Sequence, residues 1–114
     1  MTTNDQHNGG DGLGLNREIE SYLRGEPPPP AELARAPLLQ GWGAVITRAR
    51  SDAGRVRLLM VLTGHVVGHP HQADGRTIRT SEVIWLDRDR NWARSWNRLY
   101  RLGAPVVNRA DPRE

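Results

Sequence analysis

Four consecutive prolines occupy residues 27–30 and divide the sequence into two parts. Proline has a fixed φ and no amide hydrogen, so this run cannot lie inside a helix or in the middle of a sheet. We expect a short polyproline II spacer that ends where Pro30 begins a new helical turn. Pro37 should end that turn, because proline disfavours the helical conformation in the residue before it.

The pattern on either side of the prolines sets the predicted domain organisation. Before them, Leu15, Ile19 and Tyr22 recur at helical spacing, and Gly25 is a plausible end of the helix. The glycine-rich polar start cannot offset its own ordering entropy, so we expect it to be disordered. One α+β domain is therefore predicted at 15–107, between a disordered tail at 1–14 and a frayed tail at 108–114. It comprises an amphipathic helix (15–25), a proline-rich connection (26–37) and a basic core (38–107).

Within the core, two segments read as strands. The run LLMVL at residues 58–62 has the length and β-branched flank of a buried strand, which Pro70 should stop. Asp74 and Gly75 form a turn pair, residues 76–79 begin the return, and residues 82–86 alternate like a second strand. The polar residues 87–91 suit another reversal.

Two other segments are ambiguous. In residues 38–50, Leu38, Leu39, Trp42, Val45 and Ile46 fit one helical face, although Gly41 and Gly43 weaken that pattern. We predict a short helix or turn that buries Trp42. Residues 91–102 fit either a strand or a helix, and aromatic content favours the strand. A strand would place alternate residues on one face: Trp92, Arg94, Trp96, Arg98, Tyr100 and Leu102.

These elements predict an α+β fold in which one or two short N-terminal helices pack on a small antiparallel β meander or open barrel of three to five strands. The chain has 114 residues, which is one domain by the usual size range. It has no cysteine, which excludes disulfides and thiolate metal sites and favours a reducing, cytoplasmic setting. No segment is apolar for long enough to predict a membrane span, and no signal peptide or cofactor is predicted.

Charge is distributed unevenly along the chain. Residues 1–37 carry three arginines against six acids, whereas residues 38–109 carry twelve arginines against five acids. A basic core of this kind favours a polyanionic partner, either nucleic acid or an acidic or nucleic-acid-bearing protein complex. The oligomeric state stays open.

The candidate binding residues lie near the C-terminus, where arginines alternate with aromatic rings. Nucleic-acid binders combine cations for the phosphates with rings on which bases stack. Arg94, Arg98 and Arg101 would contact phosphates, and Trp96 and Tyr100 would stack on bases. The complete predicted set is Arg88, Arg90, Arg94, Trp96, Arg98, Tyr100 and Arg101.

Catalysis and metal binding are not predicted. His65, His69 and His71 are the residues with which a metal site could be built, but on a regular strand His65 and His69 stand roughly 13 Å apart at about 3.3 Å per residue. Thr80 and Ser81 lack the G-x-S-x-G context of a nucleophilic serine. The sequence contains no phosphate-binding glycine loop of the G-K-[ST] type. We therefore expect a non-enzymatic protein.

Several short motifs occur in a characteristic order: TGHVVGHP, DGRTIRTSEV, LDRDRNWARSW and NRLYRLG. In these motifs, over residues 31–105, the chain resembles an uncharacterised family of short arginine-rich proteins from alphaproteobacteria, often carried on plasmids or prophages. The resemblance implies no activity and no catalytic residue. It implies an alternative to nucleic-acid binding, which is a mobile-element inhibitor or accessory factor acting on a host protein complex. A homo-oligomeric structural module is a lesser alternative.

Overall fold

The structure is a computed structural model and describes residues 8–106. The predicted tail at 108–114 lies outside this range, as do the first seven residues. The chain divides into two compact units, residues 1–32 and 33–114, and each is described by itself. None of the helices in the described range is long and apolar enough to cross a membrane.

The first unit contains helix α1, Asn8–Leu23. The helix begins seven residues earlier than the predicted start at residue 15. It ends as predicted near Gly25, which has a φ of 86°. A residue in this left-handed conformation closes a helix, and glycine adopts it without steric cost. A second helix, α2, spans Pro30–Arg35; it begins at Pro30 as predicted and ends two residues before Pro37.

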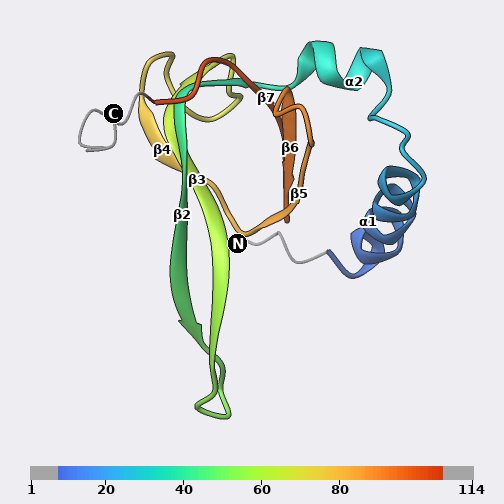
Figure 1. The fold of residues 1–114 in the computed structure, drawn as a ribbon, viewed down its shortest axis with the longest axis vertical. Coiled ribbons are helices and arrows are strands. Elements are labelled where there is room, and N and C mark those ends of the chain that lie inside the picture. The colour runs from blue at the N-terminus through green and yellow to red at the C-terminus, as the bar shows by residue number, and fades with distance from the viewer. Residues whose placement is uncertain (1–7, 107–114) are drawn as a thin grey trace. The chain divides into compact units, whose positions relative to one another are not determined.

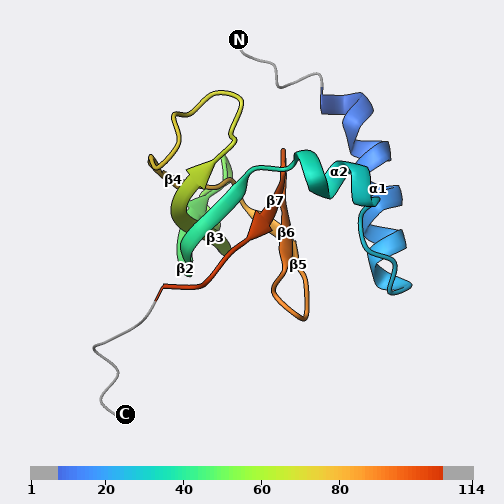
Figure 2. The same cartoon turned by 90° about the horizontal axis from the view of Figure 1, so that it is seen from above.

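The second unit contains a mixed six-stranded sheet in the order β4-β3-β2-β7-β6-β5. Figure 2 shows β4, β3 and β2 on one side of it and β7, β6 and β5 on the other. Neighbouring strands are antiparallel except β2 and β7, which are parallel. The strands are β2 (Leu38–Arg50), β3 (Val56–Val67), β4 (Thr77–Arg79), β5 (Val83–Leu86), β6 (Trp92–Ser95) and β7 (Leu99–Leu102).

The predicted layout of helices on an antiparallel meander or barrel of three to five strands is wrong. The sheet has more strands, contains a parallel pair and is open, with β4 and β5 at its edges. Two misread segments account for the difference. Residues 38–50 form a strand rather than a helix or turn, and residues 91–102 form two strands rather than one element.

Long-range pairing explains why residues 38–50 are extended. β2 pairs with β3 from Leu38 to Arg50, with one irregularity between Gln40 and Gly43. Gly41 lies in that irregularity with a φ of 60°. The glycine that weakened the helical pattern therefore allows a β-bulge in the strand. The backbone hydrogen bonds of the ladder outweigh the helical spacing of the apolar residues.

The core lies on one face of the sheet and joins its two sides. Leu39 and Leu62 are fully buried, and Ala93 lies opposite Tyr100 on the β6–β7 pair. A Cβ at Gly64 would stand 2.9 Å from Leu39 Cγ, so the packing of Leu39 against β3 requires glycine there. The buried cluster consists of Leu39, Trp42, Leu62, Val66, Ala93, Tyr100 and Leu102.

Candidate nucleic-acid interface

The outer part of the β2–β3 hairpin extends beyond the rest of the sheet (Figure 1). The β7 ladder reaches only Leu39 on β2, and the β4 ladder reaches only Thr63 on β3. From residue 44 to residue 61 the ladders of the described sheet pair these two strands only with each other. We call this segment the β-arm. Its β2 half extends about 20 Å at roughly 3.3 Å per residue.

The β-arm is strongly basic. It contains a single acidic residue, Asp52, in the turn at its tip. Its four cations come in two pairs, one on each strand or its adjoining turn. They are Arg48, Arg50, Arg55 and Arg57.

One face of the β-arm combines cations with exposed aliphatic side chains. The register places Arg48 opposite Leu58 and Arg50 opposite Val56, and opposed residues share a face of the ribbon. Leu58 is 65% exposed and Ile46, on the same face, is 62% exposed. We call Ile46, Arg48, Arg50, Val56 and Leu58 the outer strip. The predicted buried strand at residues 58–62 is part of β3, but Leu58 is exposed and burial begins only near Val61.

The opposite face is tied to Glu82, the residue that precedes β5. The guanidinium of Arg57 donates two hydrogen bonds to the Glu82 carboxylate, with N–O distances of 3.0 and 3.1 Å. This hydrogen-bonded ion pair holds the pKa of Glu82 below its ordinary value. Arg57 is therefore an anchor of the β-arm, whereas Arg48, Arg50 and Arg55 make no ion pair with any described acid.

We expect the Arg57–Glu82 pair to add a small, pH-dependent stability. Because the folded pKa of Glu82 is lowered, its contribution is present above the ordinary value of 4.5 and disappears as the pH falls below it. Glu82→Gln should lower the melting temperature by at most a few degrees at neutral pH, since the pair is exposed. Melting curves of both proteins from neutral to acidic pH should converge below pH 4.5. A constant difference across that range would contradict the assignment.

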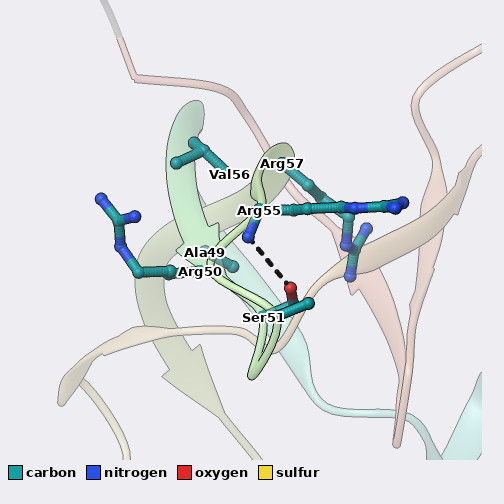
Figure 3. A pocket seen from close by; sticks show the side chains of 7 residues that line it. Ala49, Arg50, Ser51, Arg55, Val56 and Arg57 are labelled. Carbon is teal, nitrogen blue, oxygen red and sulfur yellow. Dashed lines mark hydrogen bonds between the residues drawn. The ribbon is translucent and has the colours of Figure 1, made fainter.

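The tip of the β-arm is a tight, hydrogen-bonded turn. Arg50 donates to the Gly54 carbonyl oxygen at 3.1 Å, and the Arg55 backbone N–H donates to Ser51 Oγ at 3.2 Å. Figure 3 shows the Arg50 side chain on one side of the tip and the Arg55 and Arg57 side chains on the other. An open hollow at the tip is lined by Ala49, Arg50, Ser51, Ala53, Arg55, Val56 and Arg57. Positive charge therefore surrounds the end of the ribbon.

The C-terminal residues predicted to bind a partner do not form one surface. The chain reverses between Ser95 and Arg98, so Ala93 faces Tyr100 and Arg94 faces Leu99 across a hairpin. Tyr100 is 4% exposed and belongs to the core, so it cannot stack on a base. The single strand that would have placed its ring beside Trp96 does not exist.

The predicted arginines of this segment are also separated. Arg101 Nε donates to the Ala36 carbonyl oxygen at 2.9 Å, which joins β7 to the end of α2. Arg94 is half-buried on β6 between Trp85 and Leu99 on the neighbouring strands. Arg98 is half-buried and lies near His69 and Tyr100.

The exposed members of the predicted set lie at opposite ends of β6. Trp96, which is 55% exposed, occupies the β6–β7 turn. Arg88 and Arg90 are exposed in the β5–β6 turn, where Arg90 adopts a φ of 58°. The structure therefore leaves a lone ring at one end and two cations at the other.

Two of the three predicted histidine candidates have a polar neighbour of their own. His65 Nδ1 lies 3.0 Å from Thr77 Oγ1, and His69 Nδ1 accepts a hydrogen bond from the His71 backbone N–H at 3.0 Å. Between residues 8 and 106, no group of three or more His, Asp or Glu side chains is placed to hold a metal ion.

A family model described as a family of unknown function (DUF6634) matches residues 17–110. The chain belongs to this family. The predicted membership of an uncharacterised family is thus confirmed, and the match to DUF6634 covers both helices from residue 17 onward and all six strands. Comparisons with curated proteins and with solved structures found no match.

The sequence contained a signal for the β-arm that the helical interpretation obscured. In residues 45–50 and 55–59, arginines and aliphatic residues alternate in the pattern of a two-faced strand. The turn between them, Ser51-Asp52-Ala53-Gly54, has the composition of a hairpin loop. A hairpin with cations on both strands could therefore have been predicted from the period-two pattern.

Proposed function

We propose that this member of DUF6634 binds nucleic acid through the β-arm and has no enzymatic activity. The observation that carries the proposal is the β-arm itself, a projecting two-stranded ribbon with four arginines and one acid. Phosphate contacts supply most of the affinity of such proteins, and arginine provides them with a planar set of donors. The outer strip offers Arg48 and Arg50 side by side with exposed aliphatic groups.

Duplex DNA is the form of nucleic acid that suits this geometry best. The major groove of B-form DNA admits a two-stranded β-ribbon, whereas the major groove of duplex RNA is too narrow for side chains to read. The exposed Leu58 and Ile46 would contact thymine methyl groups or sugar edges. The cations on both sides of the tip would contact the phosphates that border the groove.

Binding should be measured by fluorescence anisotropy on labelled duplex DNA, duplex RNA and single-stranded DNA. We expect duplex DNA to bind most tightly, with an affinity that falls steeply as salt rises from about 25 to about 200 mM. Three to four phosphate contacts would give a slope of roughly −3 in a plot of log K against log salt. If none of these three nucleic acids binds at the lowest salt concentration, the proposal is contradicted.

The aliphatic part of the outer strip favours a second candidate, which is binding to another protein. Ile46, Val56 and Leu58 are each 48–65% exposed, and exposed apolar groups beside arginines are common at protein interfaces. An inhibitor or accessory factor, including one carried on a mobile element, would use this strip. This candidate would be favoured if the protein recovers one specific partner from a nuclease-treated extract and does not bind DNA. The Leu58→Asp variant should then fail to recover that partner.

A further inference from the structure

Four side chains capable of donating hydrogen bonds meet at a second location, away from the outer strip. His69 and His71 come from the connection between β3 and β4, and Arg98 and Tyr100 come from the β6–β7 hairpin. The His69 ring centroid lies 6.0 Å from that of His71 and 6.3 Å from that of Tyr100. Arg98 lies close enough to affect the titration of both His69 and Tyr100.

The hydrogen bonds within this group leave donors available. The Arg98 guanidinium lies near the Tyr100 hydroxyl, and its charge opposes the rise in the pKa of Tyr100. Because a guanidinium cannot accept, the hydrogen of the Tyr100 hydroxyl must point to another acceptor. Nδ1 of His69 accepts from the His71 backbone, so a neutral His69 carries its proton on Nε2. Guanidinium, hydroxyl and imidazole therefore each present an N–H or O–H.

The electrostatics of the group are positive. Burial is the main cause of the lowered pKa of His69, and the charges of Arg98 and His71 lower it further. Burial likewise raises the pKa of Tyr100, which keeps its hydroxyl protonated. The acid of the same connection, Asp74, accepts a hydrogen bond from the Gly68 backbone N–H at 2.8 Å and is not among the groups that shift His69.

We propose that His69, His71, Arg98 and Tyr100 form a binding site for a single phosphate group. A phosphate has three or four acceptor oxygens and a negative charge, which match a set of donors gathered around one cation. Its charge would favour the protonated form of His69, which burial and the neighbouring cations disfavour. Neither His69, His71, Arg98 nor Tyr100 belongs to the β-arm, so this site goes beyond the function proposed above.

The ligand has one chemistry but two possible sources, free phosphate and the terminal phosphate of a nucleotide or oligonucleotide. Histidine ring signals of the full-length protein should be followed by NMR while inorganic phosphate is added at constant ionic strength, with chloride as the reference. We expect a saturable shift of the His69 signals and a rise in melting temperature. The signals of His65, whose ring is hydrogen-bonded to Thr77, should stay in place.

Three variants separate the site from a general salt effect. Arg98→Gln should weaken phosphate binding by about tenfold or more, since it removes a charged donor. Tyr100→Phe keeps the ring in the core and removes only the hydroxyl, and should weaken binding several-fold. His71→Ala alters an exposed side chain but keeps the backbone donor to His69. This variant should therefore fold normally and bind phosphate more weakly. Unchanged affinity in all three variants, or no response of His69 to phosphate in the wild type, would overturn the proposal.

Oligonucleotides that differ only in a 5′-phosphate or a 5′-hydroxyl identify the source of the ligand. Tighter binding of the phosphorylated form, lost in Arg98→Gln, would assign the site to a terminal phosphate. Equal binding of the two forms, with His69 saturated by inorganic phosphate, would assign it to the free ion. The two proposals fail independently: Arg48→Gln/Arg50→Gln should keep the response of His69 to phosphate, and Arg98→Gln should keep the salt dependence of duplex binding.

Discussion

Replacing Arg48 and Arg50 together by glutamine should abolish most of the binding to duplex DNA. Both side chains lie on the exposed face of the β-arm, and neither makes an ion pair with a described acid. Each phosphate contact that is lost should reduce the salt slope by about one. The double variant should therefore lose about two units of slope and at least tenfold in affinity at low salt. Anisotropy titrations at several salt concentrations measure both quantities.

The matched control is Arg88→Gln/Arg90→Gln, which removes the same charge from the β5–β6 turn. These two arginines belong to the set predicted from the sequence, so the comparison also decides between the two surfaces. If binding depends on the β-arm, the control should keep nearly the full salt slope, because it changes only long-range attraction. A larger loss in the control than in the β-arm variant would move the interface to the C-terminal turns.

The second large effect concerns stability. Leu62→Ala should lower the free energy of unfolding by about 2–5 kcal/mol, because the Leu62 side chain is fully buried and its removal leaves a cavity in the core. Leu58→Ala changes the same residue type on the same strand and face. Since Leu58 is 65% exposed, its replacement should change stability by less than about 0.5 kcal/mol. Urea denaturation of both variants provides the measurement.

The Leu58 variant has a second use. If the aliphatic groups of the outer strip contact a partner, Leu58→Ala should weaken binding while leaving the denaturation curve in place. Equal destabilisation by the two leucine variants would show that the outer end of β3 is covered. That result would contradict the exposed face on which the proposed interface depends.

Local chemistry was enough to predict the boundaries of many elements. Pro30 and Pro37 bound α2, and Asp74 and Gly75 turn the chain between β3 and β4. The alternation in residues 82–86 marked β5, and the polar residues after it marked the next reversal. Each of these features depends on residues close together in the sequence, where backbone preferences and turn chemistry decide the structure.

Features that depend on distant partners were misread. Leu38, Leu39 and Trp42 have helical spacing, yet the backbone of Leu38 and Leu39 pairs with β3 and β7, and Trp42 forms a parallel bridge with Pro105. The Trp42 indole donates to the Gly103 carbonyl oxygen at 2.9 Å. The reversal after Ser95 contains no glycine or proline, and its turn-forming residues Ser95 and Asn97 were interpreted as part of one continuous element. The reversal is held by Ser95, which exchanges hydrogen bonds with the backbone of Arg98.

The candidate site was misread for the same reason. Arginine and aromatic content drew attention to residues 88–101, but exposure depends on which face the core covers, and pairing partners decide that. Tyr100 was predicted to stack on a base and is instead part of the core. The arginines and aliphatic groups of the β-arm are exposed because the hairpin extends past its neighbouring strands. Composition alone does not reveal this extension.

The parallel pairing of β2 with β7 determines when the sheet can form during synthesis. These two central strands are the first and the last of the sheet, and they meet only at Leu38 with Arg101 and at Leu39 with Leu102. The β2–β3 hairpin and the β5–β7 strands can form early, because their contacts are local. They can be joined only after residue 102 has left the ribosome. Until then the apolar faces of both halves are uncovered, so the nascent chain is most prone to aggregate before residue 102 has emerged.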